Sequence, residues 1–181
     1  MPKLIDTNVM LAASAIYSDL SALADEASPM EATLRQIVYD ELKEFEESDE
    51  FMVLDDEGLI RDEYERNMPF NSQMQSQEYG LLVLQKKLDL NHVNWVTIDV
   101  REGNGERIGV ISDEMALIIK DREDHKWIAS AHSHNVLYGG FPPIVYGAES
   151  DWFMIEAQLG EHGFAFKRLL PKEWYQSRHQ S

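Results

Sequence analysis

The stretch Lys3-Leu4-Ile5-Asp6-Thr7-Asn8-Val9-Met10-Leu11 decides how the rest of the chain is interpreted. A brief apolar run leads to an aspartate, which two small polar residues and further apolar residues follow. This pattern is typical of a buried parallel strand that ends in a charged residue. In open α/β sheets, ligands bind at the edge where the carboxyl ends of the strands lie. We therefore expect Asp6 to belong to a functional site, and later acidic residues to meet it there.

Length and composition favour one globular domain. The chain has 181 residues, of which 44% are hydrophobic, enough to bury a core. It contains no apolar run long enough to cross a bilayer, and no signal peptide precedes the first strand. With no cysteine, disulfides, thiolate metal sites and cysteine nucleophiles are excluded. We expect a cytoplasmic protein that has no contact with a membrane.

The net charge constrains the choice of partner. The chain carries 33 acidic residues against 16 Lys and Arg, a formal charge of −17 at pH 7. A field of that sign repels a polyanion, whereas nucleic-acid-binding modules are usually basic. Either the partner is not a nucleic acid, or the acids hold cations that bridge to it. Part of the excess is a run of acids within residues 40–50, which we interpret as a solvated helix face.

Hydrophobic periodicity and turn signals predict alternating strands and helices. Strands are expected over 4–5, 51–54, 95–98, 144–146 and 164–169, and a hairpin over 96–100 and 108–111. Helices are expected over 9–27, 30–48, 59–68, 77–89, 113–119, 121–135 and 151–161, the second starting from Ser28 as N-cap and Pro29. This alternation indicates a three-layer α/β/α fold with a mainly parallel central sheet. One domain would span residues 1–171, followed by a polar tail over 172–181.

Acidic residues recur where strand ends or helix starts would place them at one edge of the sheet. They are Asp6, Glu63, Asp124 and Asp151, with Glu149 two residues before the last. Carboxylates brought together without partners repel one another, and burial raises their pKa values further. Such a cluster persists when a cation fills it, and oxygen ligands suit Mg²⁺ or Mn²⁺. The pattern therefore predicts a divalent-metal site.

Each acid taken alone has a simpler interpretation. Asp6 could form a turn with Thr7 and Asn8, and Glu63 could be surface charge. Asp124 and Asp151 could stabilise the starts of the helices that follow them. Only the recurrence of an acid at equivalent places favours the metal site. Within that site, Thr7 and Asn8 are expected to orient Asp6 through hydrogen bonds.

Four short stretches resemble the PIN-domain family of metal-dependent nucleases. Residues 4–9 are similar to that family's opening strand and first acid, and residues 55–64 to the approach to its second acid, here Glu63. Residues 121–131 resemble the helix that carries the third acid, here Asp124. Residues 144–152 are similar to the final strand and its acidic ending, although Glu149 stands where the family commonly has Asp or Asn. The fourth ligand could therefore be Glu149, Asp151 or both.

The resemblance implies a metal-dependent endoribonuclease. Asp6 and Asp124 would hold Mg²⁺ or Mn²⁺ directly, while Glu63 and Asp151 would bind it directly or through water. Arg61, Arg122 and Lys126 would contact the nucleic acid, and Arg66, Lys120, Lys167 and Arg168 are further basic residues near the expected site. The substrate would be RNA, with DNA as the alternative. The resemblance also implies a possible antitoxin or other regulatory partner and a possible homodimer, but the chain is longer than the compact toxin nucleases of toxin–antitoxin pairs.

Two other functions remain open from the sequence. The domain could be a catalytically weak PIN-like scaffold that binds a basic partner protein. A phosphatase using Asp6 as nucleophile ranks lower, because Asn8 stands where that chemistry needs a second aspartate. Ser130, His132 and His134 do not form a catalytic set, because positions two apart on a helix face different ways. Trp95, Trp127 and Trp152 are expected in the core.

Overall fold

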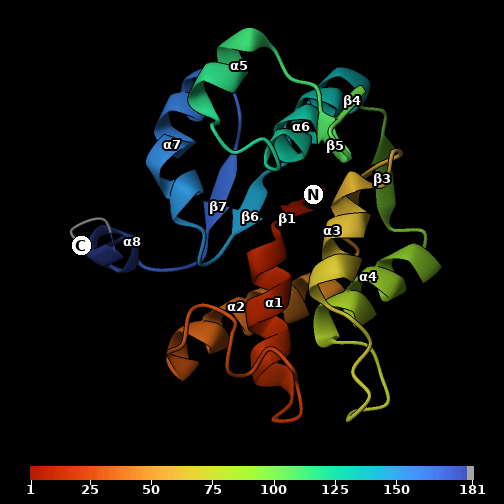
Figure 1. Cartoon of the computed structure of the whole chain (residues 1–181), viewed down its shortest axis with the longest axis vertical. Coiled ribbons are helices and arrows are strands. Elements are labelled where there is room, and N and C mark those ends of the chain that lie inside the picture. The colour runs from red at the N-terminus through yellow and green to blue at the C-terminus, as the bar shows by residue number, and fades with distance from the viewer. Residues whose placement is uncertain (179–181) are drawn as a thin grey trace.

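The computed structural model describes residues 1–178 and has a mixed α/β fold (Figure 1). The strands are β1 (Leu4–Ile5), β2 (Met52–Asp55), β3 (Val93–Val96), β4 (Val100–Gly103), β5 (Glu106–Gly109), β6 (Ile144–Tyr146) and β7 (Phe166–Arg168). The helices are α1 (Thr7–Tyr17), α2 (Ala32–Glu47), α3 (Leu59–Asn67), α4 (Tyr79–Asp89), α5 (Asp113–Ile118), α6 (His125–Tyr138), α7 (Ser150–Glu161) and α8 (Lys172–Arg178).

The sheets are short and mostly parallel, as the alternation of strands and helices predicted. β6 pairs in parallel with β1 on one side and β7 on the other, and β2 pairs in parallel with β3. The backbone of Lys3 joins the two sheets: its N–H donates to Phe51 O and its carbonyl accepts from Val53 N, both at 2.9 Å. Hydrogen bonds thus connect the strands in the order β3-β2-β1-β6-β7. β1 and β6 lie side by side and run in the same direction, although the two strands are far apart in sequence (Figure 1).

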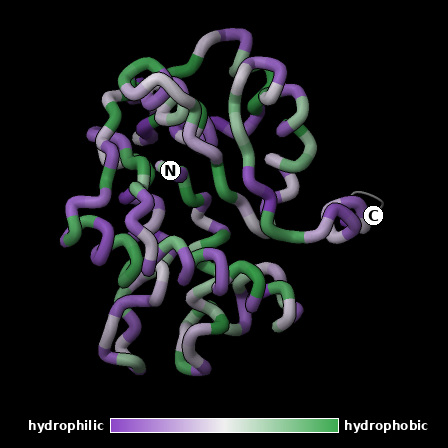
Figure 2. The backbone as a smooth tube through the Cα atoms, turned by 180° about the vertical axis from the view of Figure 1, so that it is seen from behind, coloured by the Kyte–Doolittle hydropathy of each residue, from purple (hydrophilic) through white to green (hydrophobic). Residues whose placement is uncertain are grey.

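The core lies around these strands. Every residue of β1, β2 and β6 is buried, as expected for parallel strands covered on both faces. Hydrophobic and hydrophilic residues alternate along the helices, which is typical of amphipathic elements packed on a core (Figure 2). Within residues 1–178, no helix has both the length and the apolar content needed to cross a bilayer.

The first long helix is shorter than predicted. It ends at Tyr17 instead of Ala27, and the next helix begins at Ala32 with Glu31 as N-cap, so the predicted start at Ser28 was wrong. Tertiary contacts hold the intervening loop. The buried Glu78 carboxylate accepts hydrogen bonds from Ser21 Oγ at 2.8 Å and Ala22 N at 3.1 Å. These partners lie far along the chain, where helical periodicity gives no sign of them.

Two further expectations need correction. Trp95 was expected in the core, but it is 44% exposed on β3, whereas Trp127 and Trp152 are buried. Residues 172–178, predicted as a polar tail, form α8. Its Tyr175 is buried, stacks on Phe153 with ring centroids 4.8 Å apart and donates a hydrogen bond to the Gly147 carbonyl. The last residues of that predicted tail, 179–181, lie outside the described residues.

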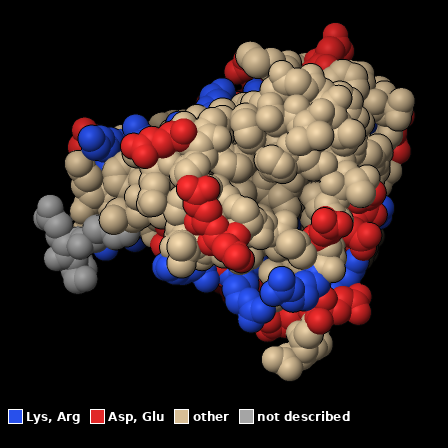
Figure 3. Space-filling view, turned by 90° about the horizontal axis from the view of Figure 1, so that it is seen from above, with Lys and Arg blue, Asp and Glu red and all other residues tan. Residues whose placement is uncertain are grey.

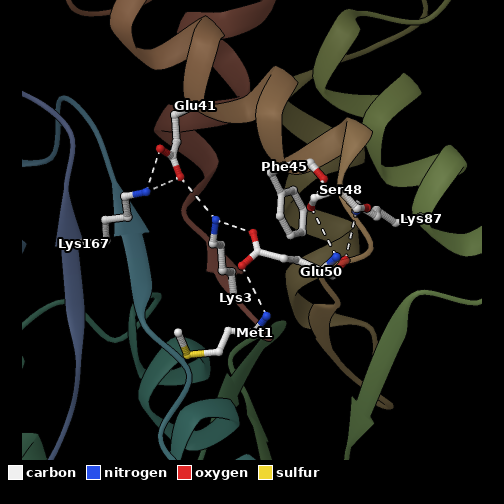
Figure 4. Close-up of polar contacts among 8 residues, drawn as sticks. All are labelled: Met1, Lys3, Glu41, Phe45, Ser48, Glu50, Lys87 and Lys167. Atoms are coloured by element: carbon white, nitrogen blue, oxygen red, sulfur yellow. Dashed lines mark hydrogen bonds and ion pairs between the residues drawn. The ribbon is translucent and has the colours of Figure 1, made fainter.

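A network of basic residues fastens the start of β1 to its surroundings (Figure 4). Lys3 Nζ lies 2.6 Å from Glu50 Oε2 and 3.4 Å from Glu41 Oε1, and Lys167 Nζ lies 2.7 Å from Glu41. The buried Lys87 ammonium donates to the carbonyls of Ser48 and Glu50 at 2.8 and 2.9 Å. These cations therefore stabilise the fold. Lys167, which was expected near the site as a further basic residue, is paired with Glu41 instead of being free to bind a phosphate.

Candidate functional site

The candidate site lies where the strand order reverses. β2 lies on one side of β1 and β6 on the other, so the connections that leave β1 and β6 diverge at their carboxyl ends. In open α/β sheets this is the place where ligands bind. Asp6 follows β1 directly, and Glu149 follows β6 after a short turn. Each is the N-cap of the helix that comes next. Asp6 thus also forms the turn that its simpler interpretation gave it, whereas the cap expected at Asp151 is Glu149.

Asp6 is buried and firmly held. Its side chain is 3% exposed, Oδ1 accepts a hydrogen bond from Asn8 N at 2.9 Å, and Oδ2 accepts one from Trp152 Nε1 at 3.1 Å. Burial, followed by repulsion from Glu149, raises the pKa of Asp6 to about 7. The carboxylate is therefore fixed in direction, and no Lys, Arg or His within residues 1–178 forms an ion pair with it.

Thr7 and Asn8 connect Asp6 to two other acids. Asn8 Nδ2 donates to Glu149 Oε2 at 2.8 Å, and Thr7 Oγ1 donates to Glu63 Oε1. The expectation that Thr7 and Asn8 orient Asp6 through hydrogen bonds is confirmed for Asn8, whose backbone N–H donates to Asp6 Oδ1, and is wrong for Thr7, whose hydroxyl bonds Glu63. Their side chains instead hold acids that come from α7 and α3.

Asp124 approaches the same space from the start of α6. It is the N-cap of that helix, but its side chain makes no capping hydrogen bond. Burial is the main cause that raises the pKa of Asp124 to about 8, and repulsion from Asp6 and Asp121 adds to it. Glu149 contributes to the same repulsion, and burial raises the pKa of Glu149 as well. We call Asp6, Asp124 and Glu149 the acidic triad, because Glu149 repels the charge of Asp6 and both of these acids repel the charge of Asp124.

Glu63 has its own counter-ion. Lys126 Nζ contacts Glu63 Oε2 and also donates to the Glu123 carbonyl, and the Lys126 side chain is only 7% exposed. Lys126 was expected to contact nucleic acid, but the structure places its ammonium inside the site. Arg61 pairs with Glu65 at 2.7 Å on the exposed face of α3, while Arg122 is exposed.

Of the two candidates for the fourth acid of the predicted site, Glu149 lies closer to the other acids than Asp151 does. Glu149 lies beside Asp6 and is partly buried, whereas Asp151 is exposed and its backbone N–H donates to Glu149 Oε1 at 3.2 Å. Within residues 1–178, no three His, Asp or Glu side chains come close enough together to hold a metal ion as a group. The acids are thus neighbours without forming a closed coordination shell.

The sequence pattern did not reveal three residues that support the site. Trp152, expected only as a core residue, also donates to Asp6. Tyr64 is buried under β1, where its hydroxyl donates to the Ile5 carbonyl. Asp55, the last residue of β2, is buried and accepts from Leu59 N at 2.8 Å and Ile60 N at 2.9 Å. The last contact fixes the start of α3, the helix that carries Glu63.

Replacing Asp55 by alanine is expected to lower the free energy of unfolding by about 1–3 kcal/mol, because two N–H groups at the start of α3 lose their acceptor. Urea unfolding followed by circular dichroism measures the change. Asp56→Ala is the matched control, since Asp56 is exposed and its loss should change stability by less than about 0.5 kcal/mol. Equal losses in both variants would contradict this role for Asp55.

We compared the chain with protein-family models, with curated proteins and with solved structures. None of them matches. The function of the protein must therefore be inferred from the residues of this site and their surroundings.

Proposed function

We propose that the protein hydrolyses phosphodiester bonds in RNA with the help of Mg²⁺ or Mn²⁺. The observation that carries the proposal is the acidic triad: three acids with raised pKa values near the carboxyl ends of β1 and β6, two of which Asn8 holds by hydrogen bonds. A cation that binds there relieves the repulsion among these acids, and this relief favours its binding. The strand order β3-β2-β1-β6-β7 supports a three-layer α/β/α arrangement of PIN type, with the acids at its carboxyl edge.

The donor set fits a hard divalent cation. Carboxylate oxygens are the ligands that Mg²⁺ and Mn²⁺ prefer, and Mg²⁺ usually keeps several waters while one or two carboxylates bind it. Such a partly hydrated ion needs only one or two direct carboxylate ligands. It therefore fits a site in which the described residues bring no three acids into direct coordination distance. Asp6 and Asp124 would bind the ion directly, and Glu149 and Glu63 would reach it through water.

Neighbouring residues hold the acids of the triad in fixed orientations. When bound, the cation supplies a water of lowered pKa and offsets charge on the leaving oxygen. Asn8 and Trp152 fix the direction of the Asp6 carboxylate, and the Asn8 side chain fixes Glu149. The Lys126 ammonium faces Glu63 from the side of α6 and pairs with its carboxylate. No nucleophilic side chain is required by this chemistry.

A cleavage assay on labelled single-stranded RNA and DNA tests the proposal. We expect RNA to be cut in Mn²⁺ or Mg²⁺ and to stay intact in EDTA, while p-nitrophenyl phosphate, a phosphomonoester, stays intact in all three. Mn²⁺ should also raise the melting temperature, because an ion that binds only the folded state stabilises it. Absence of cleavage together with an unchanged melting temperature in Mn²⁺ would refute the proposal.

One observation favours a second function, a scaffold that binds a basic protein. Lys126 already neutralises Glu63, and the described acids do not close around an ion. A scaffold would form a tight complex with a basic partner, such as an antitoxin, without any turnover of nucleic acid. The cleavage assay separates the two functions.

A further inference from the structure

Lys126 places a positive charge among the acids of the site. It lies two residues after Asp124, near the start of α6, and its side chain is only 7% exposed. Its ammonium contacts Glu63 Oε2 and donates a hydrogen bond to the Glu123 carbonyl. Lysine side chains are almost never fully buried unless they are paired. The contact with Glu63 is therefore part of what allows this lysine to lie inside the site.

This pair differs from the charge pairs on the surface. In the view of Figure 3, Lys and Arg lie beside Asp and Glu along one margin of the molecule, where water surrounds them. Exposed pairs, such as Arg107 with Glu57, are screened by water and contribute little. The side chains of Lys126 and Glu63 are 7% and 14% exposed, so solvent screens their charges much less. The charge of Lys126 therefore acts strongly on the acids around it.

Lys126 occupies the side of the site that faces α3. Both oxygens of the Glu63 carboxylate are engaged there, since Thr7 Oγ1 donates to Oε1 and Lys126 contacts Oε2. The same ammonium acts on a second acid. Burial raises the pKa of Asp124 to about 8, and the charge of Lys126 acts in the opposite direction. One lysine thus offsets negative charge on acids from both α3 and the start of α6.

Packing keeps Lys126 in this position. β5 lies directly against its backbone, because Gly109 has no side chain and a Cβ there would come within 3.0 Å of Lys126 Cα. The ammonium lies 5.6 Å from the centroid of the Trp127 ring, which is itself buried. Three contacts therefore hold the ammonium: the Glu63 carboxylate, the Glu123 carbonyl and the Trp127 ring. It is a permanent part of the site.

We propose that the Lys126 ammonium takes the place of a second divalent ion, so that the site binds a single Mg²⁺ or Mn²⁺ beside Asp6 and Asp124. The inference rests on the proposed function, because it requires that these acids bind a metal. Nucleases of the two-metal class hold two ions about 4 Å apart. A second ion here would approach the ammonium, and like charges repel strongly where little water screens them.

Counting the bound ions tests this inference without any assay of activity. The metal-free protein is titrated with Mn²⁺ in a calorimeter at about pH 8, as wild type, Lys126→Met and Lys126→Arg. Methionine keeps an apolar stem and removes the charge, whereas arginine keeps the charge. We expect one ion in the wild type and in Lys126→Arg, and about two in Lys126→Met, because Glu63 Oε2 loses its cation and the site becomes more negative.

Lys120→Met is the matched control. Lys120 lies on the loop before α6, is exposed and forms no ion pair with any residue in the range 1–178, so this variant should still bind one ion. Melting temperatures give a second readout. In EDTA, Lys126→Met should melt below the wild type, because Glu63 loses its counter-ion. Mn²⁺ should then raise the melting temperature of Lys126→Met more than that of the wild type, since an additional ion binds the folded state.

Each outcome has a definite meaning. An additional ion in Lys126→Met alone supports the inference. Two ions in the wild type, one ion in a folded Lys126→Met, or an additional ion in Lys120→Met overturns the inference and leaves the proposed function in place. A wild type that binds no Mn²⁺ refutes both. Because the count in the wild type can contradict the inference by itself, the test does not depend on the folding of Lys126→Met.

Discussion

Asp6→Asn is expected to reduce metal-dependent RNA cleavage by more than about a hundredfold, since it removes a central negative charge from the acidic triad. Asp124→Asn should have an effect of similar size, because Asp124 enters the same space from α6. Initial rates on a labelled single strand in Mn²⁺ measure the loss. Retained cleavage in both variants would remove the triad from the mechanism.

Asp6→Asn should not unfold the protein. The amide oxygen keeps the hydrogen bond from the Asn8 N–H or the one from the Trp152 indole, and the loss of a buried charge relieves repulsion from Glu149, which offsets the lost bond. Circular dichroism and the melting temperature in EDTA verify this. Asp151→Asn is the matched control: Asp151 is exposed at the start of α7, so the rate should stay within about threefold of the wild type. A larger loss in this control than in Glu149→Gln would show that Asp151 is the fourth acid.

The melting temperature of the metal-free protein is expected to fall as pH rises from about 5.5 to about 8.5. Asp6 and Asp124 have pKa values of about 7 and about 8 in the folded state, against 3.8 without the fold. The folded state therefore holds these protons at pH values where the unfolded chain has released them. Stability from this difference is fully present below about pH 4 and disappears as pH rises through the folded pKa values.

Acids with the opposite shift do not obscure this trend. Glu46 and Glu50 have lowered pKa values in spite of partial burial, because they accept hydrogen bonds from neighbouring groups, among them Tyr79 and Lys3. Their contribution changes only below the ordinary pKa of glutamate, about 4.3, outside the measured window. Differential scanning calorimetry in EDTA follows the trend, and Asp6→Asn/Asp124→Asn serves as the control with a flatter profile. A wild-type melting temperature that rises between these pH values would contradict the shared burial of the acids.

Mn²⁺ should restore the thermal stability that the metal-free protein loses at about pH 8.5. A bound cation favours the ionised acids, so its stabilising effect is expected to be larger at about pH 8.5 than at about pH 5.5. The same calorimetric series with Mn²⁺ in place of EDTA measures the difference. An equal effect of Mn²⁺ on the wild type and on Asp6→Asn/Asp124→Asn would locate the ion elsewhere.

Local patterns predicted the elements that build the site. A short apolar run followed by an acid was sufficient to predict β1 and Asp6, because a strand buried on both faces must be apolar throughout. The small-residue helix after Asp124 was predicted for a similar reason, since its periodicity and its acidic start are local properties. The Asn-Gly signal indicated the β4–β5 hairpin, but the paired strands lie closer to the turn than predicted.

The contacts that organise the site depend on positions far apart in the chain. Asn8 reaches Glu149, Thr7 reaches Glu63 and Trp152 reaches Asp6, and none of these pairs has a spacing that a helix or a strand would reveal. The same is true of Lys126, whose burial against Glu63 changes it from an expected phosphate contact to an internal counter-ion. Exposed and buried lysines look alike in a sequence, because only the packing of other elements decides which one keeps its water.

The sequence by itself thus determined a mixed α/β fold, the strand that carries Asp6, and a set of acids at strand ends and helix starts. These are consequences of hydrophobic periodicity and capping, which operate over a few residues. The tertiary structure alone decided that Glu149 rather than Asp151 lies beside Asp6 and that Lys126 faces Glu63. Those features arise when distant segments pack together, because burial and charge pairing depend on which side chains end up within a few ångströms of one another.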